Sequence, residues 1–175
     1  MKPKNIVFTG MMGCGKTTAG KMVAQLNQMQ FLDLDQMIEQ RWGSIPSLFE
    51  RGEAYFRAVE SEAVSEVSEM EGLVIATGGG VVKNLENITA LKKKGIIFFI
   101  DRPIEDILTD IDLSTRPLLK EGKNRLIQLF HERYPLYVKT CDIHLKDAKH
   151  LEDTVQKVIE LWSNISGNQL NQVPE

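Results

Sequence analysis

Residues 10 to 17, GMMGCGKT, match the phosphate-binding pattern G-x-x-x-x-G-K-[ST] at every fixed position. The glycines let the backbone fold into a concave nest of N–H donors, and Lys16 reaches the β- and γ-phosphates of a nucleotide. The Thr17 hydroxyl is a ligand for the Mg²⁺ that accompanies such phosphates. The residues expected to line the nucleotide phosphates are Gly13, Cys14, Gly15, Lys16, Thr17 and Thr18.

Two classes of nucleotide-binding protein are disfavoured by motifs that the sequence lacks. A GTPase usually carries N-K-x-D for guanine and D-x-x-G for its switch, and neither pattern occurs in the 175 residues. A motor or transporter ATPase usually ends a core strand with an aspartate, whereas the run LVIAT at 73–77 leads into three glycines. These absences favour transfer of the phosphate to an acceptor other than water.

Two aspartates in the segment FLDLD, Asp33 and Asp35, are separated by one residue. In an extended segment both side chains point to the same face, which predicts two carboxylates at the phosphate end of the sheet. One then acts on Mg²⁺ through a water, and the other orients or deprotonates an acceptor hydroxyl. The alternative is that Asp35 caps the helix formed by QMIEQRW, a common role of aspartate.

The elements that must position these residues alternate between strand and helix. Strands are expected at 4–10, 31–35, 72–77, 96–101 and 141–145. Helices are expected at 17–29, 37–42, 47–70 with a break near Gly52, 84–94 closed by Gly95, 103–111, 124–140 and 151–165. Pro135 should end or bend the helix in which it lies. The alternation predicts an α/β fold with a five-stranded parallel sheet flanked by helices on both faces, in one domain at 1–165 followed by a polar tail at 166–175.

Composition and charge narrow the choice of partners. The net charge of −3 gives a nucleic-acid partner no electrostatic support. No apolar run approaches the ~20 residues that a membrane span requires. The two cysteines, Cys14 and Cys141, are too few for a disulfide framework and indicate reduced thiols, hence a cytoplasmic protein. Small size and a polar surface favour a monomer.

Four further motifs follow the phosphate-binding loop and DLD in a fixed order: GEAYFRAVE at 52–60, TGGG at 77–80, RPLL at 116–119 and RYPLY at 133–137. Together they resemble the shikimate kinase family from about Ile6 to Leu161. The resemblance implies a three-layer P-loop kinase fold of the nucleoside-monophosphate-kinase type with a mobile lid. It also implies phosphorylation of the shikimate 3-hydroxyl by ATP with Mg²⁺, giving shikimate 3-phosphate and ADP, in the pathway to chorismate and the aromatic amino acids.

On the acceptor side, the resemblance implies that Asp35 holds the shikimate hydroxyls and serves as the base. It implies that Arg57 and Arg133 grip the shikimate carboxylate, for which planar guanidinium donors are suited. It also implies that helices at about 34–62 bind the substrate. The glycine turn that lines the substrate consists of Gly78, Gly79 and Gly80.

On the donor side, the resemblance implies that Arg116 closes on the transferring phosphate from a lid at about 111–123. It also implies that Thr17 is the direct ligand of Mg²⁺ and that Asp33 lies near the ion. Lys16 adds positive charge, which phosphoryl transfer needs because charge is spread over the phosphoryl oxygens in the transition state.

The chain departs from the family at one position and leaves alternatives open at others. Many members carry an arginine near the adenine seven residues before the lid arginine, where this chain has Thr109, and Arg102 is too far upstream to be assumed a substitute. Taken alone, Arg57 has the spacing of an ordinary surface ion pair with Glu53 and Glu60. Two other functions are compatible with the residues: another small-metabolite kinase such as a gluconate kinase, and a non-catalytic ATP-binding module.

Overall fold

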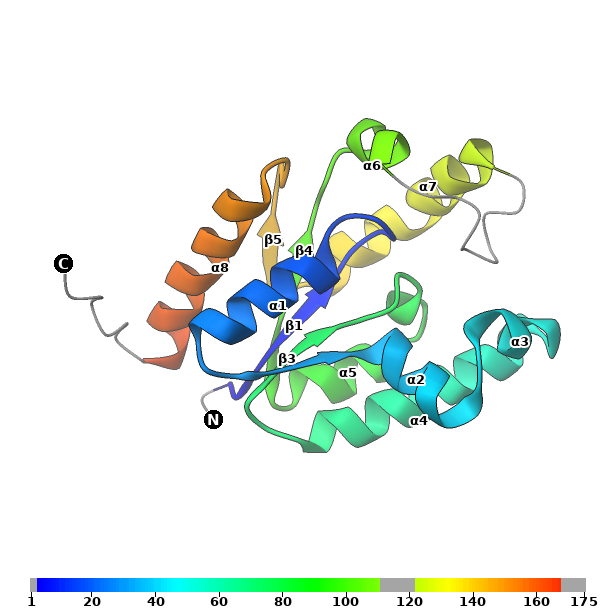
Figure 1. The fold of residues 1–175 in the computed structure, drawn as a ribbon, viewed down its shortest axis with the longest axis horizontal. Coiled ribbons are helices and arrows are strands. Elements are labelled where there is room, and N and C mark those ends of the chain that lie inside the picture. The colour runs from blue at the N-terminus through cyan, green and yellow to red at the C-terminus, as the bar shows by residue number, and fades with distance from the viewer. Residues whose placement is uncertain (1–2, 111–121, 168–175) are drawn as a thin grey trace.

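Five parallel strands form one sheet in the order β2-β3-β1-β4-β5, in a computed structural model that describes residues 3–110 and 122–167. The strands are β1 (Asn5–Thr9), β2 (Gln30–Asp33), β3 (Leu73–Ala76), β4 (Gly95–Ile100) and β5 (Ile143–Leu145). Figure 1 shows β1 in the middle of the molecule, between β3 and β4. The expected five-stranded parallel sheet is confirmed.

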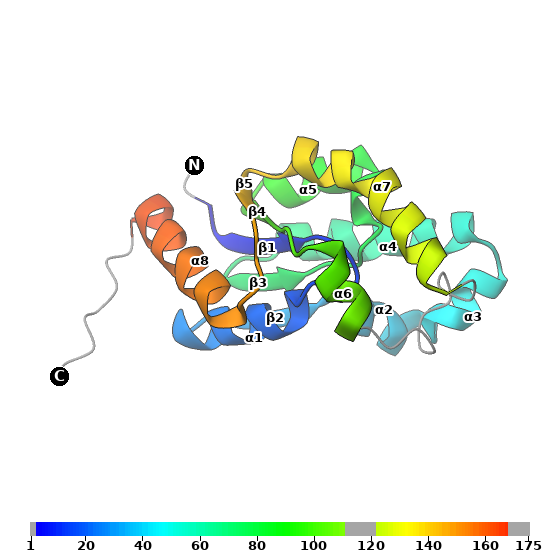
Figure 2. The same ribbon diagram turned by 90° about the horizontal axis from the view of Figure 1, so that it is seen from above.

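Helices cover both faces of this sheet, so the expected three layers are present. Figure 2 shows α5 and α7 on one side of the strands and α1 on the other, while α8 packs beside α1 and α4 packs beside α5. The α-helices are α1 (Lys16–Leu26), α2 (Leu34–Trp42), α3 (Ile45–Glu50), α4 (Glu53–Glu69), α5 (Leu85–Lys92), α6 (Ile104–Asp110), α7 (Lys123–Thr140) and α8 (Leu151–Ser166). A short 3₁₀ helix, η1 (Val81–Lys83), follows the glycine turn.

The central strands read as continuous apolar runs because helices bury them on both sides. All residues of β1 and β3 are buried, and Ile6, Val7 and Phe8 are fully inaccessible to solvent. Phe8 lies opposite Ala76 on β3 and Phe98 on β4, which fixes the register of the three central strands. Burial of this kind stabilises each large apolar side chain by about 1.5–3 kcal/mol.

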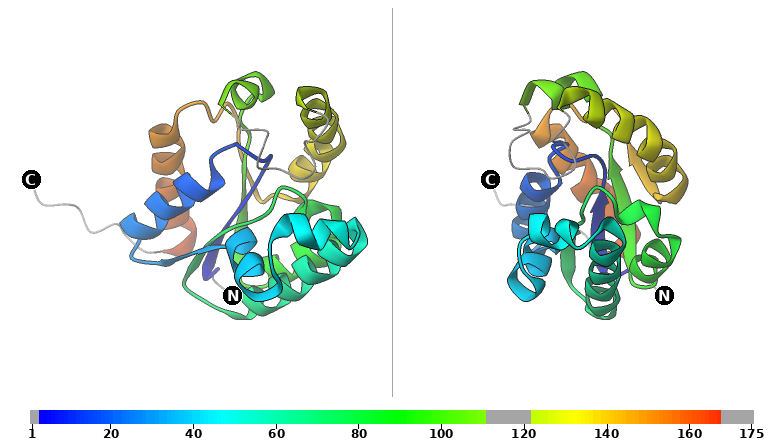
Figure 3. Two further views of the ribbon diagram at one scale, coloured as in Figure 1. Left: turned by 45° about the vertical axis from the view of Figure 1, so that its right-hand side comes forward. Right: turned by 90° about the vertical axis from the view of Figure 1, so that its right-hand side faces the viewer.

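The carboxyl ends of all five strands meet at one edge because the strands are parallel. The chain order reverses around β1, where β1 pairs with β3 on one side and β4 on the other. In open α/β sheets, ligands bind in the crevice at such a reversal. The left view of Figure 3 shows α6 and α7 at the same end of the molecule as the loop before α1. Segments far apart in sequence are therefore brought to this edge.

One sequence-based expectation about an element end is wrong, and one of the two effects expected of Pro135 is excluded. Gly95 does not close a helix: α5 ends at Lys92, and Gly95 is the first residue of β4. A Cβ at Gly95 would lie 2.8 Å from the Leu91 carbonyl oxygen, so glycine is needed there for close backbone approach. Pro135 does not end α7, which runs from Lys123 to Thr140. Buried Arg133 and Tyr137 on either side of Pro135 hold this part of the helix against the protein.

Two predicted segments lie partly outside the described residues: the lid over 111–121 and the tail over 168–175. The end of α8 is described, and Gly167 caps it in the left-handed conformation with φ 71°. Within residues 3–110 and 122–167, no helix combines the length and hydropathy that crossing a membrane requires.

Candidate active site

The loop between β1 and α1 has the backbone of a phosphate nest. Gly10, Gly13 and Gly15 adopt φ of 143°, 80° and 98°. Residues that carry a Cβ atom disfavour these values. A Cβ at Gly10 would lie 2.7 Å from the Ile100 carbonyl oxygen, so β4 also excludes a side chain there. The loop ends at the N-terminus of α1, where backbone N–H groups and the helix dipole favour an anion.

Lys16 is buried at the base of this loop, with 8% of its surface exposed. Its Nζ donates hydrogen bonds to the carbonyl oxygens of Gly10 and Met11 at 2.9 and 2.8 Å. The Cys14 sulfur lies 3.8 Å from the same nitrogen. These contacts hold the ammonium group within the loop itself, where phosphates would gather.

A cavity of about 270 Å³, here called the phosphate cavity, lies against this loop. Most of the residues predicted to contact phosphate line it, although Cys14 faces a neighbouring cavity instead. Its lining residues are Met12, Gly13, Gly15, Lys16, Thr17, Thr18, Asp33, Asp35, Thr77 and Gly79.

Thr17 and Asp33 meet in the phosphate cavity, as the sequence predicts for a metal site. The Thr17 hydroxyl donates a hydrogen bond to Oδ2 of Asp33 at 2.8 Å. The described residues hold no group of three or more His, Cys, Asp or Glu suited to a metal ion. Mg²⁺ is usually held by one or two protein oxygens together with phosphates and waters, so a hydroxyl and one carboxylate beside a phosphate nest fit this ion.

The two aspartates of FLDLD do not share an extended segment. β2 ends at Asp33, and Asp35 lies in the first turn of α2. Oδ1 of Asp33 accepts hydrogen bonds from the backbone N–H groups of Asp35 and Gln36 at 3.1 and 3.2 Å, so Asp33 caps the helix. The alternative in which Asp35 caps the helix is therefore excluded, and the expected extended geometry is wrong. Asp35 instead lines a second cavity as well as the phosphate cavity.

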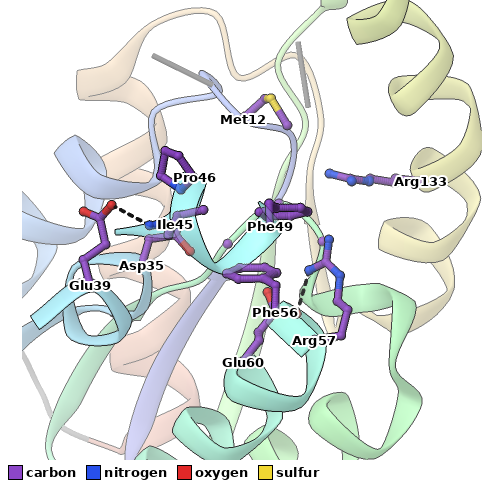
Figure 4. A pocket seen from close by; sticks show the side chains of 13 residues that line it. Met12, Asp35, Glu39, Ile45, Pro46, Phe49, Phe56, Arg57, Glu60 and Arg133 are labelled. Atoms are coloured by element: carbon purple, nitrogen blue, oxygen red, sulfur yellow. Dashed lines mark hydrogen bonds and ion pairs between the residues drawn. The ribbon is translucent and has the colours of Figure 1, made fainter. Parts of the chain in front are cut away.

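This second cavity, here called the acceptor cavity, has a volume of about 250 Å³ and adjoins the phosphate cavity. The two cavities share Met12, Asp35 and Gly79. Figure 4 shows side chains from α2, α3, α4 and α7 converging on it. Beyond the shared residues, its lining consists of Glu39, Ile45, Pro46, Phe49, Phe56, Arg57, Glu60, Gly78, Gly80 and Arg133. The volume lies below the about 300–1,000 Å³ of drug-sized pockets, which suits a small metabolite.

Arg57 forms the ion pairs that its spacing suggests, but it also lines the acceptor cavity. Its Nη1 lies 2.7 Å from Oε2 of Glu60, and its Nε lies 3.4 Å from Oε1 of Glu53. Glu60 is almost fully buried, and burial raises the pKa of its carboxyl group against the opposing effect of Arg57. Glu60 was not among the residues predicted for the site. Its position three residues after Arg57 on one helical face was the available signal.

Arg133 reaches the acceptor cavity from α7 with 2% of its surface exposed. Its Nε is buried and has no hydrogen-bond partner among the described residues. Tyr137, one helical turn later, donates a hydrogen bond from its hydroxyl to the Gly79 carbonyl oxygen. The motif RYPLY therefore places a guanidinium and a turn-holding phenol on one face of α7.

The glycine turn after β3 has no room for side chains. A Cβ at Gly78 would lie 2.7 Å from Oδ1 of Asp35, and one at Gly80 would overlap the Arg57 guanidinium. A Cβ at Gly79 would lie 3.3 Å from the Met12 backbone nitrogen. The turn thus lets the backbone approach both the acceptor cavity and the side chains that line it.

A third cavity, here called the outer cavity, has a volume of about 230 Å³ and lies on the other side of the phosphate-binding loop. It is lined by Cys14, Gly15, Thr18, Ala19, Ile100, Arg102, Ala148, Lys149, Leu151 and Thr154. Arg102 and Lys149 were not among the residues predicted for the site, because no motif marks the segments after β4 and β5. Thr109 lies on the exposed surface of α6, where its hydroxyl donates to the Glu105 carbonyl oxygen.

The structure thus brings together the predicted site residues that it describes, except that Cys14 lines the outer cavity. Asp35, Arg57, Arg133 and the three glycines surround the acceptor cavity, and Lys16, Thr17 and Asp33 lie in the phosphate cavity. Arg116, the predicted lid arginine, lies outside the described residues.

Comparison with known proteins gives a consistent family. The family model described as shikimate kinase matches residues 12–163. A shikimate kinase from Clostridium botulinum is 45% identical over 163 residues, which cover 92% of this chain and 99% of the relative. Another, from Aquifex aeolicus, has a crystal structure with a TM-score of 0.79 and 39% identity, covering 94% of this chain and 99% of that one.

A solved shikimate kinase from Acinetobacter baumannii, in complex with shikimate, superposes with a TM-score of 0.84 at 35% identity. The superposition covers 97% of this chain and 96% of that chain. Because the family model and these relatives span nearly all of the sequence, this chain belongs to the shikimate kinase family.

Proposed function

We propose that this chain transfers the γ-phosphoryl group of ATP to the 3-hydroxyl of shikimate, giving shikimate 3-phosphate and ADP. The observation that carries the proposal is the position of Asp35, which lines both the phosphate cavity and the acceptor cavity. A carboxylate at this junction can contact an acceptor hydroxyl while that hydroxyl faces the donor phosphate. Family membership favours this reaction over the gluconate kinase and binding-module alternatives.

The acceptor cavity has the chemistry that shikimate requires. Arg57 and Arg133 both line the acceptor cavity and offer guanidinium donors to the carboxylate. Asp35 accepts hydrogen bonds from the ring hydroxyls, while Gly79 and Gly80 allow the ring to lie close to the backbone. Phe49 and Phe56, which stack with centroids 4.5 Å apart, supply apolar surface to the carbocycle.

In the transfer step, the acceptor hydroxyl oxygen forms a bond to the γ-phosphorus as the bond from that phosphorus to the bridging oxygen of ADP breaks. Asp35 accepts the hydroxyl proton. Lys16 and the N–H groups at the start of α1 stabilise the negative charge of the phosphates. Arg116, which lies in the predicted lid outside the described residues, would add positive charge to the transferring phosphate.

Thr17 and Asp33 would hold Mg²⁺, with Thr17 as the direct ligand and Asp33 beside it. The bound ion supplies positive charge to the phosphate oxygens. The hydrogen bond from Thr17 to Asp33 shows that a hydroxyl and a carboxylate already share one location in the phosphate cavity.

The remaining parts of the proposal concern the protein as a whole. We propose that residues 1–165 act as one kinase domain, as a monomer in the cytoplasm, with ATP, ADP and shikimate as ligands and with no nucleic-acid or membrane partner. The negative net charge of −3 supports the exclusion of nucleic acid.

The test is ADP release with ATP and Mg²⁺ when shikimate, gluconate or AMP is supplied in turn. We expect ADP release with shikimate alone of the three, and a phosphate monoester at the shikimate 3-position by phosphorus NMR. ADP release with gluconate or AMP but not with shikimate contradicts the proposal, and so does the absence of turnover with all three.

A further inference from the structure

The acceptor, phosphate and outer cavities follow one another along the carboxyl edge of the sheet. The phosphate cavity shares Asp35 and Gly79 with the acceptor cavity, and it shares Gly15 and Thr18 with the outer cavity. A nucleotide whose phosphates lie in the middle cavity has its reacting end toward the acceptor. Its nucleoside then extends toward the outer cavity, on the opposite side of the phosphate-binding loop.

Arg102 is held rigidly at the wall of the outer cavity. Its Nη1 donates a hydrogen bond to the Gly13 carbonyl oxygen at 3.2 Å, and its Nη2 forms an ion pair with Asp110. The side chain is 20% exposed, whereas that of Asp110 is 58% exposed. Both contacts use the edge of the guanidinium, so the group is a plane of fixed orientation beside the phosphate-binding loop.

The rest of the outer cavity offers apolar surface to a planar ligand. Ala19, Ile100, Ala148 and Leu151 line it, and Lys149 supplies a second cation. A guanidinium plane stacks on aromatic rings and attracts their electron-rich faces, whereas an ammonium group does not provide such a plane. The combination fits the base of a nucleotide better than it fits another phosphate.

We propose that Arg102 positions the donor nucleotide by stacking its guanidinium on the base in the outer cavity, with Asp110 fixing the orientation of that guanidinium. The inference rests on the proposed function, since it takes the donor to be ATP with its phosphates in the loop. The nucleoside end of the donor would then be held by Arg102, which lies on the segment between β4 and α6.

The experiment compares a ligand that has a base with one that lacks it. Dissociation constants of ADP and of inorganic tripolyphosphate, each with Mg²⁺, are measured for the wild type, Arg102→Ala and Arg102→Lys. Arg41→Ala is the matched control, because Arg41 also pairs with a carboxylate, Glu66, but lines none of the three cavities. We expect both Arg102 variants to weaken ADP binding about 5- to 20-fold and tripolyphosphate binding less than about twofold.

Equal weakening of both ligands by Arg102→Ala overturns the proposal, because it shows that Arg102 acts by holding the loop through Gly13. Unchanged ADP binding overturns it as well. If Arg102→Ala does not fold, Asp110→Asn decides the matter, and a selective loss of ADP affinity of about two- to fivefold is expected. These measurements need no acceptor, so a failure of shikimate turnover with selective ADP loss refutes the proposed function and leaves the role of Arg102 standing.

Discussion

At the scale of single residues, Arg133 stands out because a guanidinium is rarely buried without full hydrogen bonding. It is 2% exposed, and its Nε lacks a hydrogen-bond partner among the described residues. Such burial costs free energy unless a ligand later satisfies the group. An anionic acceptor in the adjoining cavity would neutralise the charge of the guanidinium, which explains why the protein tolerates an arginine at this position.

We predict that Arg133→Lys weakens shikimate binding about 10- to 100-fold, because lysine keeps the charge but loses the planar donors. ADP binding should stay within about twofold of the wild type. Arg125→Lys, at a half-buried position in the first turn of the same helix that lines none of the three cavities, serves as the control. Calorimetric titration with each ligand is the measurement, and a loss of ADP affinity with intact shikimate affinity would falsify the carboxylate assignment.

Asp35 gives a second prediction at this scale. Asp35→Asn removes the proton acceptor at the junction of the two cavities while keeping the size of the side chain. We expect turnover to fall about 100- to 10,000-fold, the usual contribution of a general base. The midpoint of thermal unfolding should change little, because Asp33 and not Asp35 caps α2. Turnover equal to that of the wild type would remove Asp35 from the chemistry.

Glu60 and Glu53 both pair with Arg57, but their contributions to the free energy of unfolding should change with pH in opposite directions. Burial raises the pKa of Glu60 above its usual 4.5, so its contribution to the free energy of unfolding is greatest below 4.5 and is lost as pH rises through the raised pKa. A hydrogen bond from Lys83 is the main cause that lowers the pKa of Glu53. Its contribution is therefore present above 4.5 and is lost as pH falls through the lowered pKa.

The measurement is urea unfolding of the wild type, Glu60→Gln and Glu53→Gln from about pH 3 to about pH 7. The stability of the wild type relative to Glu60→Gln should fall as pH rises, and its stability relative to Glu53→Gln should increase. The Glu53 effect should be the smaller, since that side chain is 43% exposed. Slopes of the same sign for both variants contradict the assignment of causes.

At the scale of elements, the spacing of residues along α4 and α7 determines which side chains meet in the site. On α4, the three-residue spacing brings the Arg57 guanidinium to the Glu60 carboxylate. On α7, the four-residue spacing lets Arg133 line the cavity while Tyr137 holds the Gly79 carbonyl. The apolar residues of these two helices anchor them to the sheet, so the polar residues between them meet at defined positions.

The glycine turn and the phosphate-binding loop use glycine for different reasons, and a matched pair of variants separates them. In Gly80→Ala the new Cβ displaces the flexible Arg57 guanidinium, so shikimate affinity should fall about 10-fold while stability stays within about 1 kcal/mol. In Gly10→Ala the residue is strained at φ +143° and meets the backbone of Ile100, which should destabilise the protein by at least about 2 kcal/mol.

Shikimate binding and urea unfolding of both glycine variants are the measurements. Gly80→Ala should unfold near the wild-type urea concentration, and Gly10→Ala should unfold at a clearly lower one. A large loss of stability in Gly80→Ala would show that the turn serves folding rather than access to the acceptor cavity.

At the scale of the whole molecule, the site is a row of cavities along one edge of the sheet, and each ligand should stabilise the fold independently. At ~100 times its dissociation constant, a ligand adds about 2.7 kcal/mol, which raises the melting temperature by about 5–10 °C. Arg133→Lys should lose the shift caused by shikimate and keep the shift caused by ADP. The thermal shifts with each ligand alone test this separation, and loss of both shifts would show that the cavities do not act as separate subsites.

The sequence predicts well what depends on neighbouring residues. The phosphate-binding loop is one contiguous segment whose glycines dictate its backbone, so Lys16 and Thr17 are assigned from spacing alone. Apolar runs likewise predict the five strands, because helices bury the sheet on both faces. The break between α3 and α4 at Gly52 follows from the same local chemistry.

Where local signals compete, prediction from sequence fails at the boundaries of elements. The apolar pattern of FLDLD predicts an extended segment. In the structure the strand ends at Asp33, because the carboxylate of that residue caps α2. Gly95 resembles a helix cap, yet it opens β4 because close backbone approach requires glycine there. Tertiary packing decides such cases, since both local conformations are accessible to the chain.

The amino-acid sequence by itself therefore determined the donor chemistry, the alternation of strands and helices, and the resemblance that names an acceptor. The tertiary structure decided which side chains share a cavity: Glu60 with Arg57, Arg133 with the glycine turn, and Arg102 with the segment after β5. These contacts join residues far apart in the chain. They depend on the strand order around β1, which is set by packing of the whole sheet and not by any local pattern.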